Sequence, residues 1–98
     1  MATFITTTKF TEKGPQGIRE SGKRAAAFKA AAKKMGVKII GVYWTLGAFD
    51  TVIIFEAPDD ETATAAMLSL SAEGNVTTTT TRAFAASEIE KIVGLLGP

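Results

Sequence analysis

Five residues of the sequence carry side chains that together could form a small-molecule pocket. Tyr43, Trp44 and Phe49 offer aromatic surface, Asp50 offers a carboxylate and Lys9 offers an ammonium group. An aromatic wall with a few converging polar groups is typical of a ligand site. A buried Asp50 could accept a proton while Tyr43 or Lys9 stabilises the developing negative charge. The alternative is structural: Lys9 and Asp50 pair at the rim of a subunit interface, and the aromatic side chains fill that interface.

Three basic residues, Arg82, Lys23 and Arg24, are candidates for anion binding. Lys23 and Arg24 lie at the start of an expected helix, where backbone N–H groups already attract anions. Arg82 ends an expected strand, and a structural ion pair with Glu56 is the alternative for it. No glycine pattern of a phosphate-binding loop surrounds these residues. The acids at positions 59–61 suit the start of a helix better than a divalent cation, so we expect no metal and no cofactor.

The composition restricts the chemistry further. The chain has 98 residues, of which 46% are hydrophobic and 21% charged, as expected for one soluble domain spanning residues 1–98. It contains no cysteine, which excludes disulfides and thiol chemistry, and no histidine, which removes the usual general base at neutral pH. No apolar run approaches the ~20 residues of a membrane span. Since no signal segment is visible, we expect a cytoplasmic protein.

The spacing of apolar residues predicts the elements that position these side chains. β-branched and aromatic residues predict strands at 3–10, 37–46, 50–57 and 75–84, the last with five consecutive threonines. Apolar residues three and four positions apart predict helices at 21–35, 58–74 and 87–96. Ser21 is the expected N-cap of the first helix. Ser87 and Glu90 match a capping box at the start of the last helix.

The order β-α-β-β-α-β, followed by a short C-terminal helix, predicts an α+β ferredoxin-like sandwich. Right-handed connections give a four-stranded antiparallel sheet in the order 4-1-3-2, with two helices on one face. The RNA-recognition motif shares this topology, but its cationic and aromatic signature is missing around Gly47, and Asp50 would repel phosphate. With a net charge of only +1, we expect no nucleic-acid partner.

The two middle strands are apolar on both faces, although two helices can cover only one face. Alternation places Ile39 and Tyr43 on one face of the second strand and Ile40, Val42, Trp44 and Leu46 on the other. An exposed apolar patch of this size is rare on a monomer. We therefore expect a homodimer that stacks sheet against sheet as a dimeric α/β barrel. The alternative is that the C-terminal helix folds back over the sheet.

Several stretches of the chain resemble the GYD-domain family. They are SGKRA at 21–25, YWTLG at 43–47, GAFD at 47–50, EAPDD at 56–60, GNV at 74–76 and RAF at 82–84. The resemblance implies a small protein with the dimeric α/β barrel fold, and it implies no particular reaction. The family's Gly-x-Tyr-Asp signature carries Phe49 here in place of tyrosine. This departure removes a phenolic hydroxyl and with it a proton-transfer role for that position.

These expectations lead to one main functional hypothesis and two alternatives. The main hypothesis is a homodimer that binds a small apolar molecule and has no assignable reaction. The first alternative is a cofactor-independent monooxygenase or isomerase, a role that barrels of this architecture often carry. The second is a structural protein-interaction module. Its basis is the stretch from 19 to 38, where seven basic residues and one acid could dock on an acidic surface.

Overall fold

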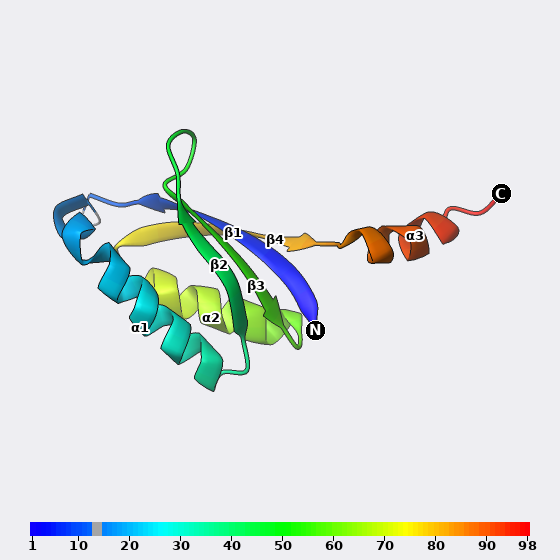
Figure 1. The fold of residues 1–98 in the computed structure, drawn as a ribbon, viewed down its shortest axis with the longest axis horizontal. Helices are drawn as coiled ribbons and strands as arrows, with labels where there is room; N and C mark the ends of the chain where they lie inside the picture. Colours follow the sequence, from blue (N-terminus) through cyan, green and yellow to red (C-terminus); the bar gives the residue numbers. More distant parts are fainter. Residues whose placement is uncertain (13–14) are drawn as a thin grey trace.

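A computed structural model describes residues 1–12 and 15–98 of the chain (Figure 1). Its elements, in order, are β1 (Ala2–Phe10), the 3-10 helix η1 (Pro15–Glu20), α1 (Ser21–Lys34), β2 (Lys38–Trp44), β3 (Thr51–Ala57), α2 (Asp60–Ala72), β4 (Val76–Ala83) and α3 (Ala86–Gly94). The predicted α+β order of strands and helices is confirmed. Each strand begins and ends within two residues of its expected position.

The strands form one antiparallel sheet in the order β2-β3-β1-β4, which is the predicted order read from its other edge. The first strand of the chain, β1, therefore lies in the centre, between β3 and β4. Figure 1 shows α1 and α2 side by side on one face of the sheet. The arrangement is a two-layer sandwich of the ferredoxin-like kind.

The hydrophobic core lies between the sheet and the two helices. Phe4 of β1 and Phe55 of β3 are buried and stack with their ring centroids 5.4 Å apart. The helices contribute mostly small side chains to this core, such as Ala32 of α1 and Ala66 of α2, each at most 1% exposed. Small residues at these positions let the helix backbones approach the aromatic layer closely, and Met67 of α2 fills the remaining space.

The ends of the helices follow local rules, with two corrections to the sequence-based expectation. Asp59 accepts a 2.7 Å hydrogen bond from the Thr62 N–H and so caps α2, as short acidic side chains do. Ser21 is not an N-cap, because η1 runs directly into α1 and Ser21 is the first helical residue. The capping contact of α3 also lies two residues earlier than expected: Glu88, not Glu90, accepts a 3.0 Å hydrogen bond from the Ala85 N–H.

A β-bulge in β2 changes which side chains share a face. The register with β3 shifts between Ile39 and Gly41, so Ile39, Val42 and Trp44 all lie on the helix side of the sheet. Tyr43 lies on the opposite face, opposite Val52. The prediction that Ile39 and Tyr43 lie on the same face of the sheet is therefore wrong. An extra residue in one strand resets the alternation, which simple period-two counting does not detect.

The sheet face that points away from the helices, called the open face below, carries several apolar side chains. Ile5 and Tyr43 are 36% and 57% exposed there, and Val52 and Ile54 are half-buried. Figure 1 shows α3 beyond the end of the sheet, on the far side from α1. The alternative that this helix folds back over the sheet is therefore wrong. Within residues 1–12 and 15–98, no helix covers the open face.

Candidate functional site

A cavity of about 70 Å³ lies between the sheet and the two core helices, near the end of β1. Its walls are mostly apolar and come from the helices and from all four strands. They include Phe10, Phe28, Val42, Trp44, Ile53 and Leu70. Trp44 is 48% exposed, so this side chain stands at the mouth of the cavity. The arrangement is that of a small apolar site that opens to solvent beside an aromatic ring.

Two threonine hydroxyls provide polar groups in this apolar wall. Thr8 of β1 and Thr51 of β3 pair across the sheet on the helix side, and they are 1% and 8% exposed. Their hydroxyl oxygens are in hydrogen-bond contact with each other. Each hydroxyl can donate one hydrogen bond and accept two. The pair therefore retains accepting capacity for a polar group that enters the cavity.

The structure separates the five residues that the sequence brought together as a pocket. Trp44 lines the cavity. Tyr43 and Lys9 lie on the open face, on the other side of the sheet, and both are exposed. Neighbouring residues of a strand point to opposite faces, so Tyr43 and Trp44 cannot both line one site. A ligand role for Tyr43 and Lys9 would need a second site on the open face.

Asp50 and Phe49 lie in the loop that joins β2 to β3, and Asp50 anchors this loop. The Phe10 N–H donates a 2.7 Å hydrogen bond to Oδ2 of Asp50, and the Asp50 N–H donates one of the same length to the Thr8 carbonyl. The Thr45 hydroxyl donates to the Phe49 carbonyl at 2.7 Å. The Asp50 carboxylate thus ties the hairpin to the end of β1 beside the cavity, which is a positioning contact. A role of Asp50 in proton transfer stays a prediction.

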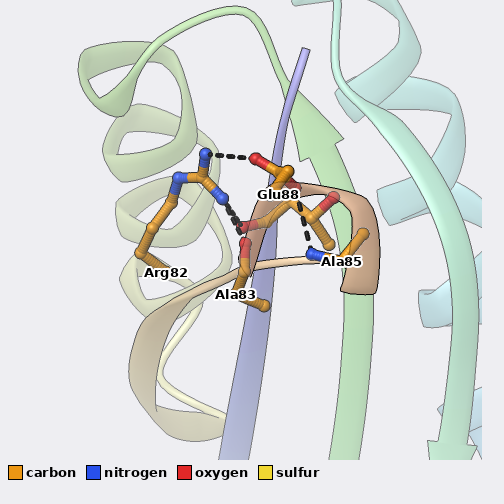
Figure 2. A network of polar contacts seen from close by, with 5 residues as sticks. Arg82, Ala83, Ala85 and Glu88 are labelled. Carbon is orange, nitrogen blue, oxygen red and sulfur yellow. Dashed lines mark hydrogen bonds and ion pairs between the residues drawn. The ribbon is translucent and has the colours of Figure 1, made fainter. Parts of the chain in front are cut away.

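Arg82, the first anion-binding candidate, is held by its own chain, as Figure 2 shows. One guanidinium nitrogen lies 3.4 Å from Glu88 of α3, and another donates to the Thr3 carbonyl at 3.2 Å and to the Ala83 carbonyl. The guanidinium carbon also lies 4.4 Å from the centroid of the Phe84 ring. These contacts fix the side chain where β4 ends, which favours the structural interpretation.

The expected partner of Arg82 was Glu56, and this pairing is wrong. Arg82 pairs in register with Phe4, on the helix side of the sheet, whereas Glu56 pairs with Thr3 on the open face. The ion pair forms instead with Glu88. The N–H of Ala85 lowers the pKa of Glu88 most, and burial acts against this effect. The hydrogen bond and the charge of Arg82 lower this pKa further.

Lys23 and Arg24 lie at the other end of the sheet from Arg82, so the three candidates form no common anion site. Lys23 pairs with Glu20 at 3.7 Å on the surface. Arg24 contributes to the wall of the cavity, together with Ser21, Glu73 and Asn75. Among the residues that the structure describes, no group of three or more acids has the spacing of a metal site.

Sequence reasoning missed most of the cavity wall, although signals for it were present. Phe28 and Leu70 occupy the apolar stripes of their helices, and Thr8 lies an even number of residues from Phe4, as Thr51 does from Phe55, so each shares a face with a large aromatic residue. What the sequence did not show was the face of the sheet on which the cavity lies. The predicted pocket combined Tyr43 and Trp44, which alternation places on opposite faces of the sheet, whereas the cavity lies on the helix side with Trp44 alone.

Comparison with known proteins assigns the chain to a family. The family model described as GYD domain matches residues 4–93, so the chain belongs to the GYD domain family. Among curated proteins, the chain is 30% identical over 90 residues to a protein of Thermus thermophilus, in a match that covers 91% of this chain and 95% of the relative. That relative is described as "Glutamine synthetase and cystathionine beta-lyase binding protein".

A solved structure is also similar to this chain. The crystal structure of TTHA0845 from Thermus thermophilus matches with a TM-score of 0.52 and 25% sequence identity, over 88% of this chain and 96% of that one. The match supports the α+β arrangement of the sheet and its helices. In the described part of the chain, every helix is too short or too polar to cross a membrane.

Proposed function

We propose that this protein forms a homodimer through the open face of its sheet and that each subunit binds a small apolar molecule in the cavity beside Trp44. The observation that carries the binding proposal is the cavity itself. Its wall is built from apolar side chains of two helices and four strands, and Trp44 stands half-exposed at its mouth. An aromatic ring that remains half in water gains contact area when a ligand covers it.

The size of the cavity restricts the ligand. Its volume of about 70 Å³ is roughly half that of the ~150 Å³ engineered cavity that holds benzene. A ligand of a few carbon atoms fits inside, and a longer one extends through the mouth against Trp44. The hydroxyl pair of Thr8 and Thr51 suits one polar group on the ligand. We therefore infer an aliphatic or small aromatic molecule with a single hydroxyl or carbonyl group.

The fluorescence of Trp44 tests the binding proposal, because this is the single tryptophan of the sequence. Titration with 1-hexanol is expected to give a saturable change in its emission. The variant Ala25→Leu places three additional carbon atoms in the cavity wall and should abolish the change. The control is Ala26→Leu, at the next and exposed position of α1, which should leave it intact. A linear response that is equal in both variants would refute the cavity as the site.

The dimer proposal is supported by the apolar side chains of the open face. Ile5, Tyr43, Val52 and Ile54 form a contiguous patch there, and such patches commonly mark interfaces. Native mass spectrometry should give twice the chain mass of 10.3 kDa. Ile54→Lys places a charge in the centre of this face and should give monomers, whereas Ala31→Lys on the exposed side of α1 should not. A monomer of the unaltered chain would refute the proposal.

A second candidate function, binding of another protein, is favoured by the relative from Thermus thermophilus. That protein is described as binding two enzymes, and its similarity to this chain covers nearly the whole of both. The basic stretch at 19–38 would attract an acidic surface. Glutamine synthetase and cystathionine beta-lyase from the organism of this chain should then bind immobilised protein, more weakly as salt rises. The absence of binding to either enzyme at low salt would refute this function for this chain.

A further inference from the structure

The helix α3 presents an apolar stripe that residues 1–12 and 15–85 leave largely exposed. Ile89, Ile92 and Val93 lie three and four positions apart and so share one side of the helix. All nine residues of α3 are described, and none of them is buried. Isolated helices shorter than ~12–15 residues are marginal in water even for favourable sequences. A helix of this length needs another surface against which its stripe can pack.

The start of α3 is fixed so that it points away from its own sheet. Glu88 pairs with Arg82 and accepts the Ala85 N–H, which joins the first turn of the helix to the end of β4 (Figure 2). Figure 1 shows the helix continuing outward beyond the sheet. The surface that covers the stripe therefore has to come from another molecule.

A groove with complementary chemistry lies at the opposite edge of the sheet. It is formed where α1 ends and β2 begins, with Val37 and Ile39 as its apolar floor. Lys29, Lys33 and Lys38 surround this floor, and all three are exposed. None of them pairs with an acid elsewhere in residues 1–12 or 15–98. Lys29 and Lys33 are four positions apart on one helix, where like charges destabilise each other.

The polar residues of α3 match this groove. Helical spacing places Glu88 and Glu90 on the two flanks of the apolar stripe and Lys91 on the side away from it. Glu88 is already bound to Arg82 and to the Ala85 N–H, so Glu90 is the acid that can meet a lysine of the groove. An apolar stripe beside this acid complements an apolar floor between lysines. Docking would bury Ile89 and Val93, which are 47% and 56% exposed, and would place the Glu90 carboxylate beside the ammonium groups of the groove.

We propose that α3 of one subunit docks in the groove between α1 and β2 of a second copy of this chain. The proposal rests on the sheet-to-sheet dimer. Consider a two-fold axis that lies between two stacked sheets and runs parallel to their strands. This axis places β4 of one copy over β2 of the other, because β2 and β4 are the opposite edges of each sheet. The groove and α3 both lie at the end of the sheet where β2 begins and β4 ends. Each copy then gives one helix and receives one.

A paramagnetic label on α3 tests this exchange directly. The sequence has no cysteine, so Lys91→Cys provides a unique attachment site, away from the apolar stripe. Spin-labelled chain at natural isotope abundance is mixed with unlabelled ¹⁵N chain, so that broadening of ¹⁵N signals reports contacts between copies. We expect broadening at residues 36–39 of the ¹⁵N chain. If the mixed protein has the mass of a dimer but shows no broadening, the docking of α3 is overturned and the dimer stands. If it has the mass of a monomer, both the docking and the dimer are overturned.

Charge exchange gives a second test that does not depend on labelling. Lys33→Glu and Glu90→Lys should each raise the dimer dissociation constant about two- to five-fold, the range that surface ion pairs support. The double variant should recover most of the affinity, since the opposite charges face each other again. Lys34→Glu is the matched control, because Lys34 lies on the same helix outside the groove. Equal effects of Lys33→Glu and Lys34→Glu, without recovery in the double variant, would refute the contact.

Discussion

The hydroxyl pair of Thr8 and Thr51 permits a sharp test of how the cavity wall is stabilised. We consider the two single substitutions Thr8→Val and Thr51→Val and the double variant. Valine has nearly the shape of threonine, so each change removes a hydroxyl and leaves the packing in place. Because both side chains are less than 10% exposed, the hydroxyl that loses its partner stays largely buried. The double variant removes both hydroxyls and leaves no polar group behind.

The magnitude follows from the cost of a buried polar group without a partner. Each single substitution is expected to lower the free energy of unfolding by about 1–3 kcal/mol. For a domain of this size, each kcal/mol corresponds to about 4–8 °C in Tm. Replacing both partners by apolar groups of the same shape is close to neutral. The two single losses add to about 2–6 kcal/mol, so the double variant should be more stable than this sum predicts by about the same amount.

Urea unfolding followed by far-UV circular dichroism measures these differences. Protein concentration is held constant, since a dimer makes the apparent stability depend on it. Ser69→Ala, at an exposed position of α2 away from the open face, is the control and should change stability by no more than about 0.5 kcal/mol. Additive effects of Thr8→Val and Thr51→Val would refute the reasoning, because they would mean that the two hydroxyls do not stabilise each other.

Three further predictions concern other parts of the fold. Hydrogen bonds from the side chain and backbone of Thr62 lower the pKa of Asp59. The contribution of the Asp59 carboxylate to stability is therefore present above pH 3.8 and is lost as the pH falls through the lowered pKa. Asp59→Asn should flatten the decline of Tm in this pH range. Gly36 has φ +83° with open space around a Cβ, so Gly36→Ala should cost about 1–2 kcal/mol through backbone strain alone, measured by urea unfolding. Phe55→Ala should cost about 3–5 kcal/mol, a large part of a typical domain stability of ~5–15 kcal/mol, and calorimetry should show a weak transition or none.

The strand order could be predicted from the sequence because local patterns and chain connectivity determine it together. The β-branched and aromatic residues of 51–57 and the positions of Gly36 and Gly74 mark element boundaries that need no tertiary information. Right-handed connections then leave few arrangements for four strands. The stop of α1 at Gly36 is an example of a purely local signal, since its positive φ suits glycine.

The candidate site could be predicted less well, because it depends on faces and on contacts between distant residues. The bulge between Ile39 and Gly41 reverses the alternation of β2; Gly41 is compatible with a bulge, but a glycine alone does not fix the new register. The choice of Glu88 over Glu56 as partner of Arg82 depends on which side of β4 the arginine occupies and on where α3 begins. Both facts are properties of the assembled sheet.

The central place of β1 has a consequence for the synthesis of this protein on the ribosome. Thr3 pairs in register with Ala83, about 80 residues further along the chain. At ~5–20 residues per second, β1 emerges about 4–16 s before its partner strand β4 is complete. During this interval the apolar side chains of Phe4 and Ile5 have at most one neighbouring strand. Slower translation between the codons for β1 and β4 would lengthen this exposure and should lower the yield of soluble protein.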